Sequence, residues 1–329
     1  MQYKQLKDMK VSALGLGCWA MGGTWNNIDD NDSVRTIHRA LDLGVNFFDT
    51  APIYGKGHSE MVLGKALKGV KRHEVVIATK CGLPFAYSSE HGRIKSRNDL
   101  SRASILKEVD DSLQRLGVDY IDLYQIHWPD PNTTIQETAE ALAQLKQQGK
   151  IRHVGVCNYS LEMVKCMVRH VEVATFQGLY NLLEHNPSHY HNIPLKYRTR
   201  DEIMPFCDEN DMSYLPYSPL MQGLLTGTFD REGNFDANDD RAANPKLNGE
   251  GFEPYYQCAQ QLKQFSQAMG VNLTHLALQW LAQQSAMGPV IAGAHKVEQI
   301  EANSRCFDRL VNHEILKEAE QIVTKWGLS

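Results

Sequence analysis

Two side chains that can exchange protons lie close together near the start of the chain. The segment 47–60 begins with Phe47-Phe48, continues through Asp49 into a loop rich in Pro and Gly that carries Tyr54, and ends in a helical pattern. This order predicts a strand end, a loop and a helix start. In parallel α/β proteins the functional site lies at the carboxyl ends of the strands, where Asp and Tyr can transfer protons. Taken alone, the segment equally fits an Asp that caps a turn and a half-buried loop Tyr.

A lysine and a histidine occupy comparable positions further along the chain. Lys80 follows the β-branched run 75–79, and His127 follows the apolar run 121–126. A lone Lys or His at a strand end is more often part of a structural ion pair. Four such side chains after three neighbouring strands favour a catalytic site instead.

The elements that would position these residues alternate between strand and helix. From Ala13 onwards, eight short apolar runs are each followed by a segment with apolar residues at helical spacing. Eight such units in about 300 residues favour a (β/α)8 TIM barrel over an open sheet. We expect one domain over residues 1–329, with an N-terminal β-hairpin at 3–11 and a C-terminal helix at 314–326. The strands are predicted at 13–17, 45–48, 75–79, 121–126, 154–156, 175–179, 214–217 and 289–291.

Helix starts and one long loop can also be placed. Asp32 and Ser59 are predicted to cap the first two helices. The stretch from Pro219 to about Pro254 is rich in Gly, Asn and Asp and too long for a routine connection, so we expect a functional loop. Residues 15–20 match a dinucleotide-binding glycine motif, but such a motif must open a helix directly. Further Gly and Asn residues follow instead, so we reject that interpretation.

Composition argues against several other classes of protein. The net charge of −5 offers no basic patch for nucleic acid and no polybasic membrane anchor. No apolar run approaches the ~20 residues of a membrane span, and residues 1–10 lack the apolar region of a signal peptide. The seven cysteines include no C-x-x-C pair, which favours a reducing compartment, and we expect a cytoplasmic protein. His and Cys do not cluster at zinc spacing, so no metal is expected.

Five short motifs lie along the chain at the predicted strand ends and loops: FDTAPIYG at 48–55, TK at 79–80, YIDLYQIH at 120–127, GKIRHVGV at 149–156 and YSPL at 217–220. Together, these motifs resemble the aldo-keto reductase family. The resemblance extends from Leu14 to Asn303 and is nearest to the bacterial stress-associated branch, which also has HWPDP (127–131) and GLLTG (223–227). It implies a metal-free (β/α)8 oxidoreductase that reduces aldehydes and ketones with NADPH.

The resemblance assigns a role to each of the four candidate catalytic residues. Hydride transfer to a carbonyl leaves an alkoxide that needs a proton, which Tyr54 would donate. A phenol with a pKa near 10 is a poor donor at neutral pH, so we expect the Lys80 ammonium to lower the pKa of Tyr54. Asp49 would hold Lys80, and His127 would donate a hydrogen bond to the carbonyl oxygen.

The resemblance also implies where a nicotinamide cofactor and a substrate would bind. Asn158 and Gln177 would hold the carboxamide and Tyr217 would stack on the ring, while Cys157 replaces a serine of the family. We expect three tryptophans to form the wall of an apolar substrate pocket, or else to pack in the core or at its rim. They are Trp19, which we also expect at the cofactor, Trp25 and Trp128.

The phosphates of the cofactor would meet two further segments. Backbone N–H groups of the loop after the seventh strand would bind the pyrophosphate, although Gln222 replaces an Arg common in this branch. The 2′-phosphate would lie near a helix N-terminus, where His295 replaces a common Arg or Lys and Lys296 keeps one cation. The remaining residues that match the family here are Ser218, Leu220, Gly223, Gly293, Gln299 and Asn303.

We therefore expect a cytoplasmic, NADPH-preferring aldo-keto reductase that acts on small aldehydes, with NADH possible as cofactor. The altered His295 leaves open an NAD-dependent aldose or pyridoxal dehydrogenase. Two alternatives come from other classes. A non-catalytic, cofactor-sensing partner protein need not keep a proton donor, and a barrel lyase or isomerase would need no nicotinamide. The physiological substrate, the direction of the reaction and the oligomeric state stay open.

Overall fold

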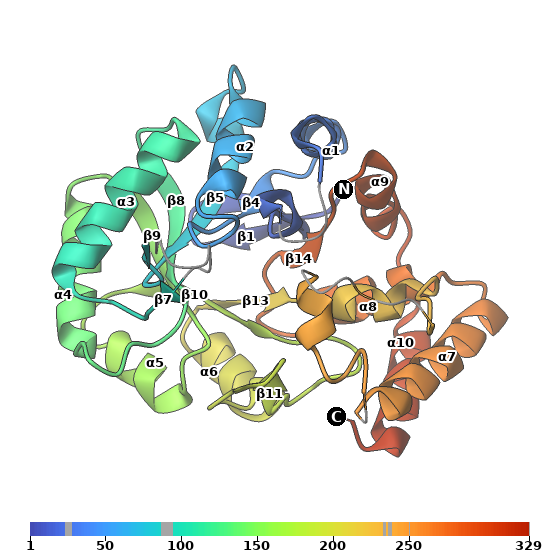
Figure 1. Cartoon of the computed structure of the whole chain (residues 1–329). Helices are drawn as coiled ribbons and strands as arrows, with labels where there is room; N and C mark the ends of the chain where they lie inside the picture. Colours follow the sequence, from blue (N-terminus) through green and yellow to red (C-terminus); the bar gives the residue numbers. More distant parts are fainter. Residues whose placement is uncertain (24–27, 87–94, 233–234, 236–238, 250, 329) are drawn as a thin grey trace.

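Eight parallel strands form one sheet that curves into a barrel, with helices around its outside (Figure 1). The structure is a computed structural model and describes residues 1–23, 28–86, 95–232, 235, 239–249 and 251–328. The predicted (β/α)8 fold is confirmed. In barrel order the strands are β13 (Ser213–Tyr217), β10 (Val173–Leu179), β9 (Ile151–Cys157), β8 (Ile121–Ile126), β5 (Val76–Cys81), β4 (Phe47–Asp49), β3 (Leu14–Gly17) and β14 (Val290–Gly293).

The barrel closes between β13 and β14 through a single bridge rather than a full ladder. Tyr214 pairs with Met287, its N–H donates to the Ala286 carbonyl at 2.7 Å, and its own carbonyl accepts from the Gly288 N–H at 2.9 Å. A Cβ at Gly288 would lie 2.7 Å from the Leu215 side chain. A larger residue at this position would therefore require the Leu215 side chain to move where the two end strands meet.

A helix follows every barrel strand, and two more helices pack beside the barrel (Figure 1). The additional helices are α7 (Phe252–Ala268) and α10 (His313–Trp326). The C-terminal helix α10 contacts α7 and the barrel helix α8, as predicted for a C-terminal helix packed on the barrel. A π-helical segment, Thr199–Ile203, leads into α6. The eight barrel helices are α1 (Asp30–Asp42), α2 (His58–Leu67), α3 (Arg102–Leu116), α4 (Ile135–Gln147), α5 (Leu161–Met167), α6 (Met204–Glu209), α8 (Leu273–Ala282) and α9 (Val297–Arg305).

Two predicted helix caps are wrong. Asp29, not Asp32, caps α1, because its side chain accepts a hydrogen bond from the backbone N–H of Asn31. Gly57, in a left-handed conformation, precedes α2. Ser59 is buried, and its hydroxyl bonds to the Cys18 carbonyl and the Thr50 hydroxyl, both at 2.8 Å.

The predicted N-terminal hairpin closes one end of the barrel. Its strands are β1 (Tyr3–Leu6) and β2 (Met9–Ser12), and its apolar side chains join a buried cluster inside the barrel. Since side chains alternate along a strand, the inward positions nearer the carboxyl ends of β4, β5 and β8 hold polar residues. The cluster consists of Leu6, Met9, Val11, Phe47, Val76, Ala78, Leu123, Ala174, Leu215 and Ile291.

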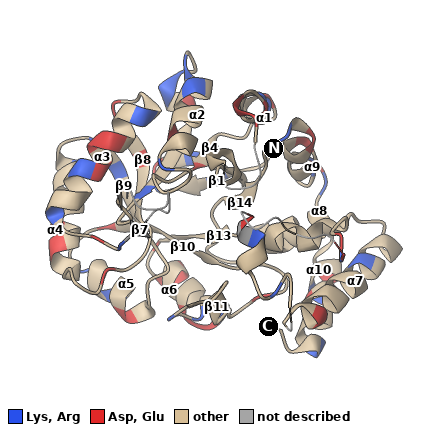
Figure 2. Ribbon diagram, viewed as in Figure 1, with Lys and Arg blue, Asp and Glu red and all other residues tan. Residues whose placement is uncertain are grey.

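The outer surface carries charges of both signs. Figure 2 shows Lys and Arg interspersed with Asp and Glu on the outer helices, for example on α3 and α4. Within the described ranges, no helix has both the length and the apolar character needed to cross a membrane.

Candidate active site

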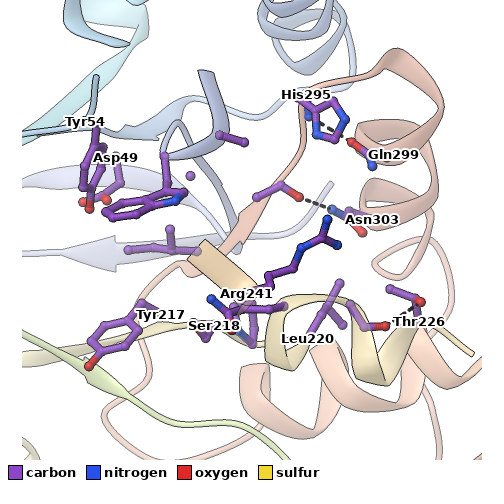
Figure 3. Close-up of a pocket in the computed structure, with 18 of the residues that line it drawn as sticks. Asp49, Tyr54, Tyr217, Ser218, Leu220, Thr226, Arg241, His295, Gln299 and Asn303 are labelled. Carbon is purple, nitrogen blue, oxygen red and sulfur yellow. Dashed lines mark hydrogen bonds between the residues drawn. The ribbon is translucent and has the colours of Figure 1, made fainter. Parts of the chain in front are cut away.

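A cleft of about 1140 Å³ opens at the carboxyl ends of the barrel strands and continues toward α9 (Figure 3). Asp49, Tyr54 and His127 line its inner end. The loops after β4 and β8 and the last residue of β4 thus meet in one cavity, as the sequence predicts.

Lys80 lies behind Tyr54, fully buried, and connects the predicted catalytic residues. Its ammonium donates to Asp49 Oδ2 at 2.7 Å, to the Thr50 carbonyl at 2.9 Å and to the Tyr54 hydroxyl at 3.1 Å. The ring of Tyr54 meets that of His127 edge to face, with centroids 5.8 Å apart. The structure therefore brings all four residues together.

Burial decides the charge states in this group. Burial opposes the charge of Lys80, but the neighbouring Asp49 carboxylate and Tyr54 hydroxyl raise its pKa, so the ammonium persists. Burial raises the pKa of Tyr54 to about 12, although the Lys80 charge acts in the opposite direction. The expected lowering of the Tyr54 pKa is therefore wrong for the protein without cofactor, because desolvation exceeds the attraction of a cation that Asp49 already neutralises.

His127 is neutral at pH 7. Burial lowers its pKa well below the usual value, and the Lys80 charge adds to this effect. A neutral imidazole has one N–H to donate, and the ring faces the cleft beside Tyr54. It can thus donate a hydrogen bond to an oxygen atom held between the two rings.

Polar side chains follow at the ends of β9, β10 and β13. Asn158 has a left-handed backbone, and its amide donates to the His127 carbonyl at 3.1 Å while its oxygen accepts from the Tyr217 hydroxyl at 3.0 Å. Gln177 donates to Asp49 Oδ1 at 2.8 Å. The Cys157 thiol lies 3.9 Å from the Gln177 oxygen, and burial raises its pKa, so the substituted position holds a neutral thiol against Gln177.

The loop after β13 bends sharply around the middle of the cleft. Ser218, Met221 and Gln222 all have positive φ values of 46–53°, and Gly223 has a φ of 109°. Three of the predicted phosphate-binding positions in this loop line the cleft, namely Ser218, Leu220 and Gly223 (Figure 3).

The far end of the cleft lies against the start of α9. Gln299 Oε1 accepts from the backbone N–H groups of His295 and Lys296 at 2.9 and 3.2 Å, and thereby fixes this turn. Burial, followed by the Lys296 and Arg241 charges, lowers the pKa of His295. Four predicted residues line this end of the cleft, namely Gly293, His295, Gln299 and Asn303 (Figure 3).

Two predicted cofactor or substrate residues are not found among the described lining residues, for different reasons. Lys296 is the N-cap residue of α9, and it is not among the described residues that line the cavity. Trp25 lies outside the described residues. Trp19 and Trp128 do line the cavity, and Trp19 meets the Tyr54 ring at 4.7 Å between centroids.

Arg241 is a lining residue that the sequence analysis missed. It belongs to the short helix Asp240–Ala243 inside the long loop, and its guanidinium extends across the cleft toward Asn303 (Figure 3). The buried carboxylate of Asp239 holds it in a two-point contact at 2.6 and 3.0 Å. The Asp-x-Arg spacing within a loop expected to be functional is the only sequence signal for this residue.

The chain belongs to the aldo/keto reductase family, whose residue pattern matches residues 13–324. It is 37% identical over 328 residues to the aldo-keto reductase YhdN of Bacillus subtilis, covering 98% of this chain and 94% of YhdN. It is 34% identical over 306 residues to the NADH-specific methylglyoxal reductase of Escherichia coli, covering 90% of each chain. The glycerol dehydrogenase AKR11B4 from Gluconobacter oxydans superposes with a TM-score of 0.86 at 36% identity, covering 99% of this chain and 96% of that chain. The chain is thus an oxidoreductase of a family that uses nicotinamide cofactors.

Proposed function

We propose that this protein reduces small, uncharged aldehydes and ketones to alcohols with NADPH, and that Tyr54 donates the proton. The observation that carries the proposal is the buried Lys80 ammonium, which touches both Asp49 and the Tyr54 hydroxyl at the inner end of the cleft. A phenol in contact with a fixed cation is placed to lose a proton to a developing alkoxide.

Each residue of the group has a distinct part in the proposed mechanism. The bound cofactor supplies the hydride. His127 donates a hydrogen bond to the carbonyl oxygen and polarises it, and Tyr54 gives the proton as negative charge develops there. Lys80 stabilises the phenolate left on Tyr54, and Asp49 keeps Lys80 charged and in place.

The residues of the cleft fit a nicotinamide dinucleotide. The left-handed backbone at Ser218 and Gln222 forms a concave turn of the type that binds phosphates through N–H groups. At Gly293 an added Cβ would meet only the Gly17 carbonyl, at 4.0 Å, so the wall is open for a close ligand. Asn158 and Gln177 would hold the carboxamide, and Tyr217 would face the ring.

The lining of the inner cleft supports an uncharged substrate. Apart from Asp49, which Lys80 neutralises, the described Asp, Glu, Lys and Arg residues of the lining come from the long loop or from α9. The inner end is apolar and aromatic, which suits small carbonyl compounds. Its wall comprises Trp19, Ile53, Leu83, Trp128, Tyr190 and Ile193.

NADH is the second candidate cofactor, and one residue favours it. Glu298, in the first turn of α9, lines the far end of the cleft, where a carboxylate suits a ribose hydroxyl and repels a phosphate. Arg241 on the opposite side favours the 2′-phosphate of NADPH. The relative from Escherichia coli named NADH-specific supports keeping this alternative, which includes an NAD-dependent aldose or pyridoxal dehydrogenase.

The experiment is steady-state turnover against a panel that includes methylglyoxal, glyceraldehyde, pyridoxal and glycerol, with NADPH and NADH in parallel. Carbonyl reduction that is faster with NADPH supports the proposal. Cofactor binding without turnover of any compound would favour the cofactor-sensing partner protein, and turnover without a nicotinamide would favour a lyase or isomerase. Seven free thiols support the predicted cytoplasmic location, which stays a prediction.

A further inference from the structure

The Asp49 carboxylate is held from two sides. Its Oδ2 contacts Lys80, while its Oδ1 accepts from two amides, Gln177 Nε2 at 2.8 Å and Gln125 Nε2 at 3.2 Å. An ionised carboxylate can only accept hydrogen bonds, so both amides must turn their NH2 groups toward it. Asp49 is 4% exposed, and every bond it loses leaves a buried charge less well compensated.

The two amides differ in what else they can reach. Gln177 lines the cleft and is proposed to hold the cofactor carboxamide. Gln125 is fully buried on β8, two residues before His127, and it is not among the described residues that line the cleft. If Gln177 turned to a bound cofactor, Gln125 would be the amide left on Asp49 Oδ1.

A glutamine at position 125 constrains the neighbouring strand and leaves one of its own polar atoms without a partner. A Cβ at Gly155 would lie 2.8 Å from Gln125 Cγ and 2.3 Å from the Thr175 hydroxyl, so glycine is required on the neighbouring strand. Among the described residues, Gln125 Oε1 has no hydrogen-bond partner although it is buried. A leucine would avoid that unsatisfied oxygen, so core packing alone does not explain a glutamine here.

We propose that Gln125 is a positioning residue that holds Asp49 in place so that Gln177 can leave it and bind the nicotinamide carboxamide. The inference rests on the proposed function, because it takes Gln177 as a cofactor ligand. It makes Asp49 part of cofactor binding as well as of proton transfer. Without Gln125, cofactor binding would remove Gln177 from Asp49 and leave Oδ1 of this buried carboxylate with no amide donor.

Other ionisable groups around Asp49 cannot take over this role. Lys80 from β5 already occupies Oδ2, and the Tyr54 hydroxyl faces Lys80. The thiols of Cys18 and Cys157 bond elsewhere, to the Leu16 carbonyl at 3.8 Å and to the Gln177 oxygen at 3.9 Å, and burial keeps His127 neutral by lowering its pKa. The side-chain hydrogen bonds to Asp49 Oδ1 therefore come from Gln125 and Gln177.

The test is equilibrium binding to Gln125→Met, a substitution of similar length that donates no hydrogen bond. We expect its affinity for NADPH to weaken about fivefold or more. Its affinity for 2′,5′-ADP, which lacks the nicotinamide, should match the wild type. Thr175→Val, which removes the neighbouring buried hydroxyl without touching Asp49, is the matched control and should bind both ligands normally. A Gln125→Met protein that melts like the wild type and binds NADPH equally well would overturn the proposal.

A second variant separates the loss of the hydrogen bond from a folding defect in Gln125→Met. Gln125→Glu can donate to Asp49 only while its carboxyl is protonated, so its NADPH affinity should approach the wild-type value at low pH and fall as pH rises, relative to 2′,5′-ADP. An unchanged ratio across pH would also contradict the proposal. Failure of the proposed function has a different signature, since it would appear as absent turnover in the wild type or retained turnover in Tyr54→Phe, whatever the Gln125 variants bind.

Discussion

The Tyr54 hydroxyl lies 3.1 Å from the Lys80 ammonium, yet burial holds the pKa of Tyr54 at about 12. The phenol is therefore fully protonated at neutral pH, so Tyr54 already carries the proton before a substrate binds. Negative charge on a carbonyl oxygen next to the phenol would make the transfer favourable, and Lys80 would then stabilise the phenolate. In the proposed mechanism, the cation would therefore act in the transition state more than in the resting protein.

Replacement of Tyr54 by Phe should remove carbonyl reduction and leave NADPH binding near the wild-type value. The hydroxyl supplies the proton, while the ring and its contact with Trp19 remain. Losing a general acid typically reduces turnover by about a hundredfold or more. The measurement is kcat together with a fluorescence titration of NADPH. If the variant kept more than about a tenth of the wild-type turnover, a loss under ~1.4 kcal/mol, Tyr54 would not be the proton donor.

Removal of metal should leave activity unchanged. The described residues contain no group of three or more His, Cys, Asp or Glu side chains able to hold a metal ion, and the proposed chemistry uses a phenol and an ammonium instead. Turnover measured before and after exhaustive dialysis against EDTA is the check. Loss of activity with recovery on adding Zn²⁺ would contradict the mechanism.

The sequence predicts the barrel and the clustering of the four candidate catalytic residues, because both depend on local patterns. Asp49, Lys80 and His127 each follow an apolar run, and parallel topology brings strand ends together without further information. The cap of α1 could not be fixed in the same way, since three acidic residues lie within residues 29–32 and tertiary packing selects among them.

Properties set by the folded surroundings were beyond the sequence. The pKa of Tyr54 depends on how completely the ring is buried, which no motif states. Arg241 reaches the cleft because Asp239 orients it, in a loop without periodic pattern. Lys296, by contrast, is predicted from its position in the sequence, but in the structure it is the N-cap residue of α9 and is not among the described residues that line the cleft.

The described part 239–249 of the long loop should be further stabilised when the cofactor binds. Lys246, within this loop, forms an ion pair with the buried Glu184 and donates to the His189 carbonyl at 2.9 Å. Asn244 donates to Gln222 at 2.8 Å, which connects the loop to the cleft lining. We therefore expect slower hydrogen exchange over residues 239–249 with NADPH than without it. Equal exchange in both states would make the loop an ordinary surface segment.

The Lys246 anchor offers a second measurement on the same loop. Lys246→Met should speed hydrogen exchange and cofactor release, and it should raise kcat if release limits turnover. Lys317→Met, on the exposed face of α10, is the control and should change neither rate. Identical rates of cofactor release from the wild type and Lys246→Met, measured by stopped flow, would mean that the Lys246–Glu184 ion pair does not slow release.

Cofactor choice should depend on the charges at the far end of the cleft. Arg241→Ala should weaken NADPH binding by roughly 1.5–3 kcal/mol, typical of a charged hydrogen bond, and spare NADH. Lys296→Ala should act in the same direction but less, because Lys296 is not among the described lining residues. His295→Arg and Glu298→Gln should both sharpen the preference for NADPH, by adding a cation and by removing an anion.

The pH dependence provides an independent check, and its sign follows from His295. Burial lowers the pKa of His295 in the free protein, and a bound 2′-phosphate would raise it by favouring the imidazolium. NADPH binding would then take up a proton, so its affinity should fall as pH rises from about 6 to 8, whereas NADH affinity should barely change. Parallel titrations of both cofactors check this prediction.

The same titrations of the charge variants separate a lost phosphate contact from a folding defect, because a folding defect would weaken NADPH and NADH alike. If Arg241→Ala and Lys296→Ala each weakened NADPH and NADH equally, neither residue would contact the phosphate, and the NAD-dependent alternative would become the better assignment.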